Sequence, residues 1–144
     1  MHNISDFVIN VSYAEGFGLS TLEAMMTKTP IIAPKTGGQT RQVVDYRDES
    51  ENGFALPIEL QSLVGSQSVP YIYEDYTSTD TIAEKMYSMW KLGKDGREKL
   101  GQKAYDYANH EFGYQKTVDL WHDTMIETLK NWKERYERYT CEEI

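Results

Sequence analysis

The fold of this chain is decided by residues 7–44, which read FVINVSYAEGFGLSTLEAMMTKTPIIAPKTGGQTRQVV. The run Phe7–Val11 is β-branched and almost wholly apolar, which is typical of a strand buried on both faces of a parallel sheet. A glycine-bearing turn follows, and residues 19–27 then carry apolar side chains at helical spacing. Those apolar side chains are Leu19, Leu22 and Met26.

Two more strands complete the expected sheet. Pro30–Pro34 is short and apolar and ends at a proline, and Gly37 and Gly38 then turn the chain into a helix-like segment over 39–46. Residues 53–58 are typical of a third short strand. This order predicts an α/β fold, a Rossmann-like parallel sheet of about three strands with helices around it.

The rest of the chain is predicted to hold one irregular piece and three helices. Residues 59–78 contain Gly, Ser and Gln and include a strand-like run, so we expect an irregular insertion there. Periodic apolar residues predict helices over 79–92, 95–112 and 114–139, the first capped by Thr79 or Asp80. The side chains expected to face inward on the first two are Ile82, Met86, Met89, Trp90, Leu100, Ala104, Tyr107 and Ala108. We expect a single partial domain over 1–144, with a βαβαβ core over 1–58, the insertion over 59–78 and C-terminal helices over 79–144.

Composition excludes several function classes. The formal charge of -8 and the pI near 4.9 disfavour nucleic acid as a partner, because a polyanion would meet net repulsion. Cys141 is the only cysteine, so an internal disulfide is impossible and we expect a reducing, cytoplasmic environment. The apolar runs are far shorter than the roughly 20 residues that a membrane span needs, so we expect none.

The first glycine turn predicts a phosphate-binding site. A helix that begins just after a buried parallel strand directs unpaired N–H groups and the positive end of its dipole into the crevice beside the sheet. Gly16 and Gly18 let a ligand approach the backbone closely, and Leu19, Ser20 and Thr21 supply amides. We expect a diphosphate to bind here.

Two carboxylates frame this turn. Glu15 precedes it directly, and Glu23 follows eight positions later, about one turn into the predicted helix. A carboxylate accepts two hydrogen bonds from neighbouring hydroxyls, so one glutamate is suited to a sugar beyond the diphosphate and the other to a ribose. Each alone is also consistent with an exposed loop carboxylate or with a helix-start residue favoured by the dipole.

The competing motifs fit less well. Residues 16–21 differ from the dinucleotide fingerprint at the last position, where Thr21 replaces Gly or Ala. The acidic residue that a nicotinamide dinucleotide site needs about 20 positions later is also missing, because that place reads Pro34-Lys35-Thr36. A Gly-Lys-Ser/Thr phosphate loop is absent, and the three histidines lack metal-ligand spacing.

Taken together, these residues resemble the Glu-seven-residue-Glu signature of retaining GT-B glycosyltransferases of group four, the glycosyl transferases group 1 type. The resemblance rests on Glu15–Met25, on Thr29–Ala33 and on the pair Gly37-Gly38. Any one of these pieces alone is common, whereas their combination is specific. The resemblance implies that the chain is the latter half of a GT-B C-terminal domain, the half that binds the sugar donor.

The resemblance also implies roles for single residues. Glu15 is expected to act in the catalytic site by contacting sugar hydroxyls, and Glu23 to hold ribose hydroxyls of the donor. Transfer in the family retains the anomeric configuration and needs no metal, so we expect a nucleotide-diphospho-sugar as substrate and no cofactor. The other donor-binding residues, whose backbone is expected to hold diphosphate and sugar, are Gly16, Phe17, Gly18, Leu19 and Ser20.

The sequence departs from the family pattern in detail and in extent. Ser20 stands where Pro is usual, Lys28 where a helix-ending Gly is usual, and Arg41 where Glu often follows the glycine pair. Lys28 costs about 1 kcal/mol if its backbone is left-handed. The acceptor-binding domain and the upstream Arg/Lys segment of the family are missing, so we expect an N-terminal domain or a partner chain to supply them. This chain alone is then expected to be inactive.

A second interpretation is a noncatalytic binding or assembly module that keeps the fold. An aromatic and apolar stripe runs through 114–139, and without the acceptor-binding domain it is expected to lie partly bare. Its residues are Val118, Trp121, Met125, Leu129, Trp132, Tyr136 and Tyr139. If the chain is part of an enzyme, the sequence leaves three classes of acceptor open: a glycan, a lipid or a small molecule.

Overall fold

The computed structural model describes residues 2–135 and separates into two compact units, Met1–Asn109 and His110–Ile144. We expected a single partial domain over 1–144. The first unit holds a parallel sheet, a β-hairpin and the helices around the sheet, and the second holds the end of α4 (Gly93–Phe112) and α5 (Tyr114–Arg135).

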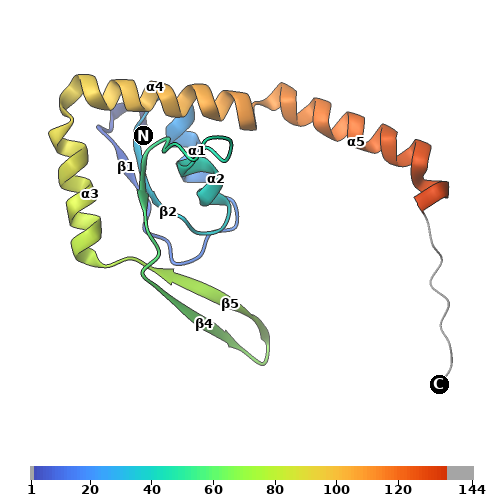
Figure 1. Ribbon diagram of the computed structural model, residues 1–144, viewed down its shortest axis with the longest axis horizontal. Helices are drawn as coiled ribbons and strands as arrows, with labels where there is room; N and C mark the ends of the chain where they lie inside the picture. Colours follow the sequence, from blue (N-terminus) through green and yellow to red (C-terminus); the bar gives the residue numbers. More distant parts are fainter. Residues whose placement is uncertain (1, 136–144) are drawn as a thin grey trace. The chain divides into compact units, whose positions relative to one another are not determined.

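The sheet has three parallel strands, β1 (Val8–Ile9), β2 (Ile31–Pro34) and β3 (Phe54–Leu56), in the order β1-β2-β3 (Figure 1). Ile32 lies opposite Ile9 on one side and Phe54 on the other. The predicted α/β fold with a three-stranded parallel sheet is confirmed. The apolar, β-branched composition of β2 suits its central position, because all four of its residues are buried.

The first strand is shorter and less buried than we predicted. We expected Phe7–Val11 to be covered on both faces, but β1 contains two residues, Val8 is half-buried and Ile9 is 36% exposed. The physical reason is its place in the sheet, since β1 pairs with β2 alone among the described strands and is therefore an edge strand. Apolar composition does not distinguish an edge strand from a central one.

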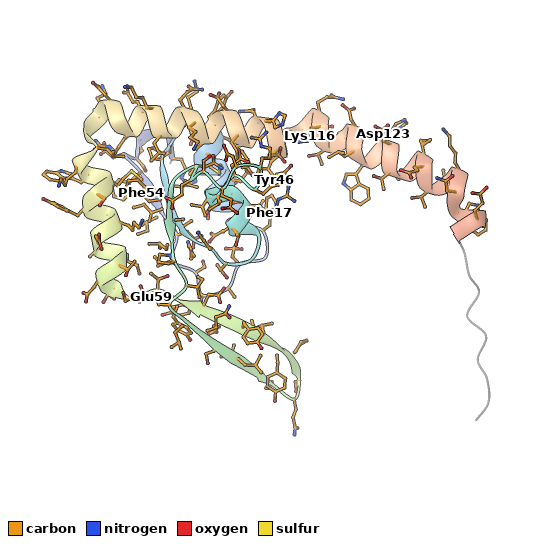
Figure 2. The ribbon with its side chains drawn as sticks, in the orientation of Figure 1. Phe17, Tyr46, Phe54, Glu59, Lys116 and Asp123 are labelled. Atoms are coloured by element: carbon orange, nitrogen blue, oxygen red, sulfur yellow. The ribbon has the colours of Figure 1, made fainter. Side chains whose placement is uncertain are left out.

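Helices cover both faces of the sheet. Successive residues of a strand point to opposite faces, and α1 (Leu19–Met26) and α2 (Thr40–Val43) both pack on β2, while α3 (Thr79–Lys91) packs on β3. Ile32, Leu56 and Met89 form the buried core beneath α3. Phe54 packs against this core and lies between the sheet and α3 (Figure 2).

Helix α1 buries a different face from the one that its leucines indicated. Its buried residues are Thr21, Ala24 and Met25. Leu19 is 68% exposed, while Leu22 and Met26 are half-buried. Helix α1 packs on β2, so its three buried residues face the sheet, and they lie on a different side of the helix from Leu19, Leu22 and Met26. The predicted helix over 39–46 is likewise shorter, a 3-10 turn η2 (Gly37–Gln39) followed by α2.

The segment 59–78, expected to be an irregular insertion, contains an antiparallel hairpin instead, β4 (Leu60–Ser66) and β5 (Val69–Tyr76), whose register shifts between Val64 and Ser66. The hairpin extends away from the sheet (Figure 1). Glu59, labelled at its base in Figure 2, accepts hydrogen bonds from Ser78 Oγ at 3.1 Å and Thr81 Oγ1 at 2.6 Å. These bonds, the one from Thr81 foremost, lower the pKa of the Glu59 carboxyl and tie the hairpin to the start of α3.

After the hairpin, the residue that caps α3 and the first residue of α4 differ slightly from those predicted. Ser78, rather than Thr79 or Asp80, caps α3, since its side chain accepts from the Thr81 amide at 3.2 Å. Helix α4 begins at Gly93 instead of Asp95. Three expected core residues of α4 are buried, and Met89 is buried on α3, whereas Met86 and Trp90 are 40% and 66% exposed. The three on α4 are Ala104, Tyr107 and Ala108.

A glycine brings α4 against the turn that follows α1. A Cβ at Gly101 would overlap the carbonyl oxygen of Lys28, so only glycine permits this approach. The backbone of Lys28 itself is left-handed, with φ of 59°. This is the conformation that we expected to cost free energy for a lysine. Its ammonium lies 4.9 Å from the centre of the Tyr105 ring, a contact that offsets part of the strain.

In the second unit, the described residues of the apolar stripe on α5 are exposed. Val118, Trp121, Met125, Leu129 and Trp132 are between 41% and 68% exposed. Tyr136 and Tyr139, the last two residues of the predicted stripe, lie outside the described residues. Among residues 2–135, the helices are all too short or too polar to cross a membrane.

Candidate functional site

The glycine turn lies at the carboxyl end of β1 and leads directly into α1. Gly18 begins the helix with φ of 88° and ψ of 55°, a left-handed conformation that glycine adopts readily. Its carbonyl accepts from the Leu22 amide at 3.0 Å, which starts the helical hydrogen bonds. Among residues 2–135, no side chain caps α1, so its first amides are oriented outward from the helix end, as we expected.

The second glycine pair packs against this turn. The Gly38 amide donates to Gly16 O at 3.2 Å. A Cβ at Gly38 would lie 2.7 Å from that same oxygen, and a Cβ at Gly37, whose φ is 48°, would overlap the carbonyl oxygen of Glu15. The pair is thus a close backbone contact that positions residues 15–17, in addition to being a turn between β2 and α2.

Two buried glutamines lie beneath the turn. Gln39 and Gln42 have no solvent-exposed surface. Gln42 Nε2 donates to the Phe17 carbonyl at 2.6 Å, and Gln39 Nε2 donates to Thr21 Oγ1 at 3.0 Å. Among residues 2–135, their side-chain carbonyl oxygens have no hydrogen-bond partner.

Sequence reasoning did not single out these glutamines. Their spacing, three positions apart beside Val43, was available as a sign that both face the core. Amide side chains are nevertheless ordinarily exposed, so the pattern alone favoured a surface position.

The predicted contact residues differ in exposure. Gly16, Phe17, Leu19 and Ser20 are exposed and Gly18 is buried. A Cβ at Gly16 would meet no atom within 4 Å, so the space in front of that residue is open. Their role in binding a donor stays a prediction, although their exposure leaves them accessible to one.

The two glutamates lie in different surroundings. Glu15 is half-buried, and its backbone is part of the contact with Gly37. Glu23 is on α1 with a side chain that is 68% exposed, and its Oε2 lies 3.6 Å from His2 Nε2, an ion pair only when the imidazole is protonated. The structure therefore joins Glu15 to the glycine turns and places His2 beside Glu23.

The hairpin braces the loop that leads to Glu15, which sequence reasoning also missed. The Asp75 amide of β5 donates to Tyr13 O at 2.7 Å, and the rings of Tyr13 and Tyr76 lie 4.5 Å apart. Tyr76 Oη donates to Glu74 Oε2 at 2.6 Å, which is the main reason that the pKa of this phenol is raised. No local sequence pattern predicts the hydrogen bond from Asp75 to Tyr13, because the two residues are far apart in sequence.

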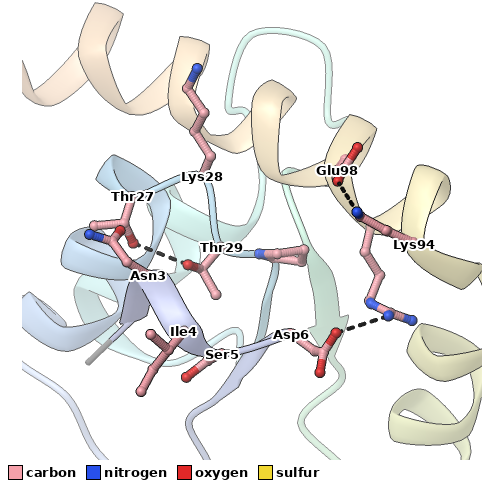
Figure 3. Close-up of a pocket in the computed structure, with 11 residues that line it drawn as sticks. Asn3, Ile4, Ser5, Asp6, Thr27, Lys28, Thr29, Lys94 and Glu98 are labelled. Carbon is pink, nitrogen blue, oxygen red and sulfur yellow. Dashed lines mark hydrogen bonds and ion pairs between the residues drawn. The ribbon is translucent and has the colours of Figure 1, made fainter.

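A pocket of about 580 Å³ lies elsewhere in the first unit (Figure 3). Asp6, Thr27 and Pro30, which line it, all precede β1 or β2, so the pocket is at the amino ends of the strands, opposite the glycine turn. Arg97 and Asp6 form an ion pair of 3.0 Å at its wall. None of the predicted donor-binding residues lines it. Within residues 2–135, no three His, Cys, Asp or Glu side chains are grouped closely enough to hold a metal ion.

Comparisons with known proteins identify relatives of this arrangement. Residues 1–107 match the family described as glycosyl transferases group 1. A D-inositol 3-phosphate glycosyltransferase from an Arthrobacter species is 44% identical over 43 residues, which is 30% of this chain and 10% of that protein.

Two solved structures share the fold. The C-terminal domain of a glycosyl transferase group 1 family protein from Francisella tularensis is 28% identical, with a TM-score of 0.55, over 78% of this chain and 46% of that one. The Anabaena protein HepE, solved in complex with UDP, is 18% identical, with a TM-score of 0.64, over 88% of this chain and 29% of that one. The chain thus spans less than half the length of the relatives that it matches.

Proposed function

The chain belongs to the glycosyl transferases group 1 family, and from that premise we propose that it is the donor-binding part of an enzyme that transfers a sugar from a nucleotide-diphospho-sugar to an acceptor with retention of configuration. The observation that carries the proposal is the glycine turn between β1 and α1. Its left-handed Gly18, its uncapped helix start and its exposed neighbours combine in one place the features that an anionic donor requires.

The diphosphate binds at the opening of α1. The first amides of a helix and its dipole favour negative charge, and the effect is largest within the first turn. Gly16 allows close approach because the space that a Cβ would occupy is empty. Phe17, Leu19 and Ser20 contribute backbone groups and exposed surface to the same site.

The glutamates bind the two sugars of the donor. Glu15 accepts hydrogen bonds from hydroxyls of the transferred sugar, next to the bond that breaks. Glu23 accepts from the ribose hydroxyls of the nucleotide. A hydrogen bond to a charged group contributes about 1.5–3 kcal/mol, so loss of either carboxylate weakens the corresponding contact about tenfold to a hundredfold.

We propose that transfer proceeds without a resident metal ion. Negative charge develops on the leaving diphosphate, and amides that are already oriented stabilise it without further reorganisation. Basic side chains from the upstream segment of the family are expected to add to this. The compartment that we propose is the reducing cytoplasm, on the ground of the single cysteine.

The complete enzyme requires an acceptor-binding domain, which we place upstream in the same protein or on a partner chain. The chain covers 46% of the Francisella domain and 29% of the Anabaena protein. The acceptor, a glycan, a lipid or a small molecule, binds to that other domain.

The decisive experiment compares nucleoside diphosphates with their sugar conjugates in the full-length protein. Isothermal titration with UDP, ADP and GDP and with their hexose conjugates first identifies the donor. Glu23→Ala is expected to weaken both ligands about tenfold to a hundredfold, because both contain ribose. Glu15→Ala is expected to weaken the conjugate alone, because only the conjugate contains the transferred sugar.

His2→Ala is the matched control for Glu23→Ala. It removes the imidazole that lies 3.6 Å from Glu23 and leaves the carboxylate in place, so it is expected to keep wild-type affinity. Equal losses in His2→Ala and Glu23→Ala, or unchanged affinity in Glu23→Ala, would contradict the assignment of the ribose to Glu23. The anomeric configuration of the product, measured by NMR, tests retention.

The exposed stripe of α5 favours a second candidate, a noncatalytic module that assembles through this helix. Its five described large apolar residues are all at least 41% exposed, and such a patch often marks a protein contact. The donor titration separates the two candidates, because a module of this kind binds no nucleotide-sugar and loses self-association or partner binding in Trp121→Ala.

A further inference from the structure

We propose that Gln42 is a positioning residue of the donor site, whose buried side-chain amide orients the peptide between Phe17 and Gly18 so that the Gly18 N–H is aimed at the diphosphate. This inference rests on the proposed function, since it assigns a role within the same site. It concerns a residue that lies under the turn and contacts no ligand itself.

The hydrogen bond that carries the proposal is short and buried at its donor end. Gln42 Nε2 lies 2.6 Å from Phe17 O, and the glutamine has no exposed surface. Gln42 is also held through its own backbone, because its carbonyl accepts from Asn52 Nδ2 at 3.1 Å. Asn52 is itself fully buried. The backbone of the residue that donates to Phe17 is therefore itself held by a buried side chain.

Peptide geometry converts this bond into an orientation. The peptide bond is planar and trans, so the carbonyl of Phe17 and the N–H of Gly18 point in opposite directions. Because the carbonyl is held towards α2, the Gly18 N–H points away from α2. The adjacent peptide is held in the same way, since Gly16 O accepts from the Gly38 amide at 3.2 Å. The N–H groups of Phe17 and Gly18, which belong to these two peptides, therefore both point away from η2 and α2. Successive N–H groups of this kind form a backbone concavity that binds anions.

The energetics of burial support a role beyond packing. An amide side chain loses free energy when it is buried without full hydrogen bonding, and the side-chain carbonyl oxygen of Gln42 has no partner among residues 2–135. That oxygen lies 2.9 Å from the point where a Cβ of Gly18 would be, directly under the turn. An apolar side chain of similar size would fill this place without an unpaired oxygen. The fold therefore keeps a glutamine where packing alone favours a hydrocarbon.

The test replaces Gln42 by Met, which keeps the length of the side chain and removes the N–H donor. Binding of the best of UDP, ADP and GDP to the full-length protein is measured by isothermal titration, and binding of the corresponding nucleoside by NMR. We expect the dissociation constant of the diphosphate to rise about five- to tenfold, which is the value of one hydrogen bond. We expect unchanged affinity for the nucleoside and a melting temperature at or above that of the wild type.

Gln39→Met is the matched control, since Gln39 is equally buried and donates to the Thr21 hydroxyl rather than to a carbonyl of the turn. It is expected to bind diphosphate within about twofold of the wild type. Gln42→Leu is a second variant that retains the comparison if Gln42→Met does not fold.

Wild-type affinity in a folded Gln42 variant overturns the positioning role and leaves the proposed function intact. Equal losses for diphosphate and nucleoside, together with a lowered melting temperature, also overturn it, because they indicate a general structural role. A wild-type protein that binds none of the diphosphates overturns the proposed function itself.

Discussion

The glycine contact between the two turns makes a sharp prediction, because two glycines of one site differ completely in the space around them. A methyl group at Gly37 would overlap the carbonyl oxygen of Glu15, whereas a methyl group at Gly16 would meet no atom within 4 Å. Gly37→Ala is therefore expected to destabilise the fold, and Gly16→Ala is expected to affect only what approaches from outside.

The magnitude for Gly37→Ala follows from two contributions. A left-handed alanine at the observed φ of 48° costs roughly 1–2 kcal/mol. Displacing the backbone of Glu15 adds about 1–3 kcal/mol, as for other insertions into a packed region. The sum is about 2–5 kcal/mol, a large part of the roughly 5–15 kcal/mol that stabilises an ordinary domain. Gly16→Ala is expected to change the free energy of unfolding by no more than about 0.5 kcal/mol.

Urea unfolding followed by circular dichroism measures both variants against the wild type, with the slope of the transition checked for two-state behaviour. Titration with the nucleoside diphosphate then shows whether Gly16→Ala, although stable, binds the ligand more weakly, as expected if the diphosphate approaches that backbone. A Gly37→Ala protein as stable as the wild type would refute the close contact between the two turns.

Two further predictions concern stability. Gly101→Ala is expected to lower the free energy of unfolding by about 1–3 kcal/mol, because the added Cβ overlaps the Lys28 carbonyl. This loss is expected despite the better helix propensity of alanine. Gln102→Ala, on the exposed side of α4, is the control in the same urea titration. The hydrogen bond from the Arg47 side chain lowers the pKa of Asp45 from 3.8 to about 2. The stability that Asp45 gains from its charge is thus present above pH 4 and is lost as the pH falls towards 2, so the urea midpoint of Asp45→Asn should fall less over that range than the wild-type midpoint.

The parts of the proposed site come from three separate segments. The turn with Glu15 follows β1, the glycine pair and Gln42 follow β2, and the hairpin that holds Tyr13 follows β3. The carboxyl ends of parallel strands meet at one edge of a sheet, which explains why segments distant in sequence are joined there. Substitutions in the hairpin are therefore able to influence the turn through the bond from Asp75 to Tyr13.

The sequence predicted those features that depend on neighbouring residues. The continuous apolar run of β2 sufficed for a buried strand, and the glycines at 16 and 18 for a turn before a helix. A glycine is usual where Lys28 stands, at the end of the helix, which pointed to a left-handed backbone at this residue. The structure has this left-handed conformation at Lys28. The α/β class and the three-stranded parallel sheet followed from the alternation of strands and helices.

Burial and long-range pairing were decided only by the tertiary structure. The hairpin over 60–76 depends on cross-strand pairs such as Leu63 with Tyr73, and its polar, glycine-containing sequence resembles that of a loop. The inward face of α1 is set by how the helix packs on β2, which leucine spacing does not encode.

The residues that the sequence alone determined are those whose local chemistry is distinctive, the glutamates and glycines of the turn. What the tertiary structure decided is which groups support them, because a hydrogen bond such as that from Gln42 to Phe17 requires two segments to be brought together by the packing of α2 on the sheet. From sequence alone a glutamine is expected at the surface, because its side chain is polar. Only the folded structure buries the side chain of Gln42 and gives its amide a defined hydrogen-bond partner.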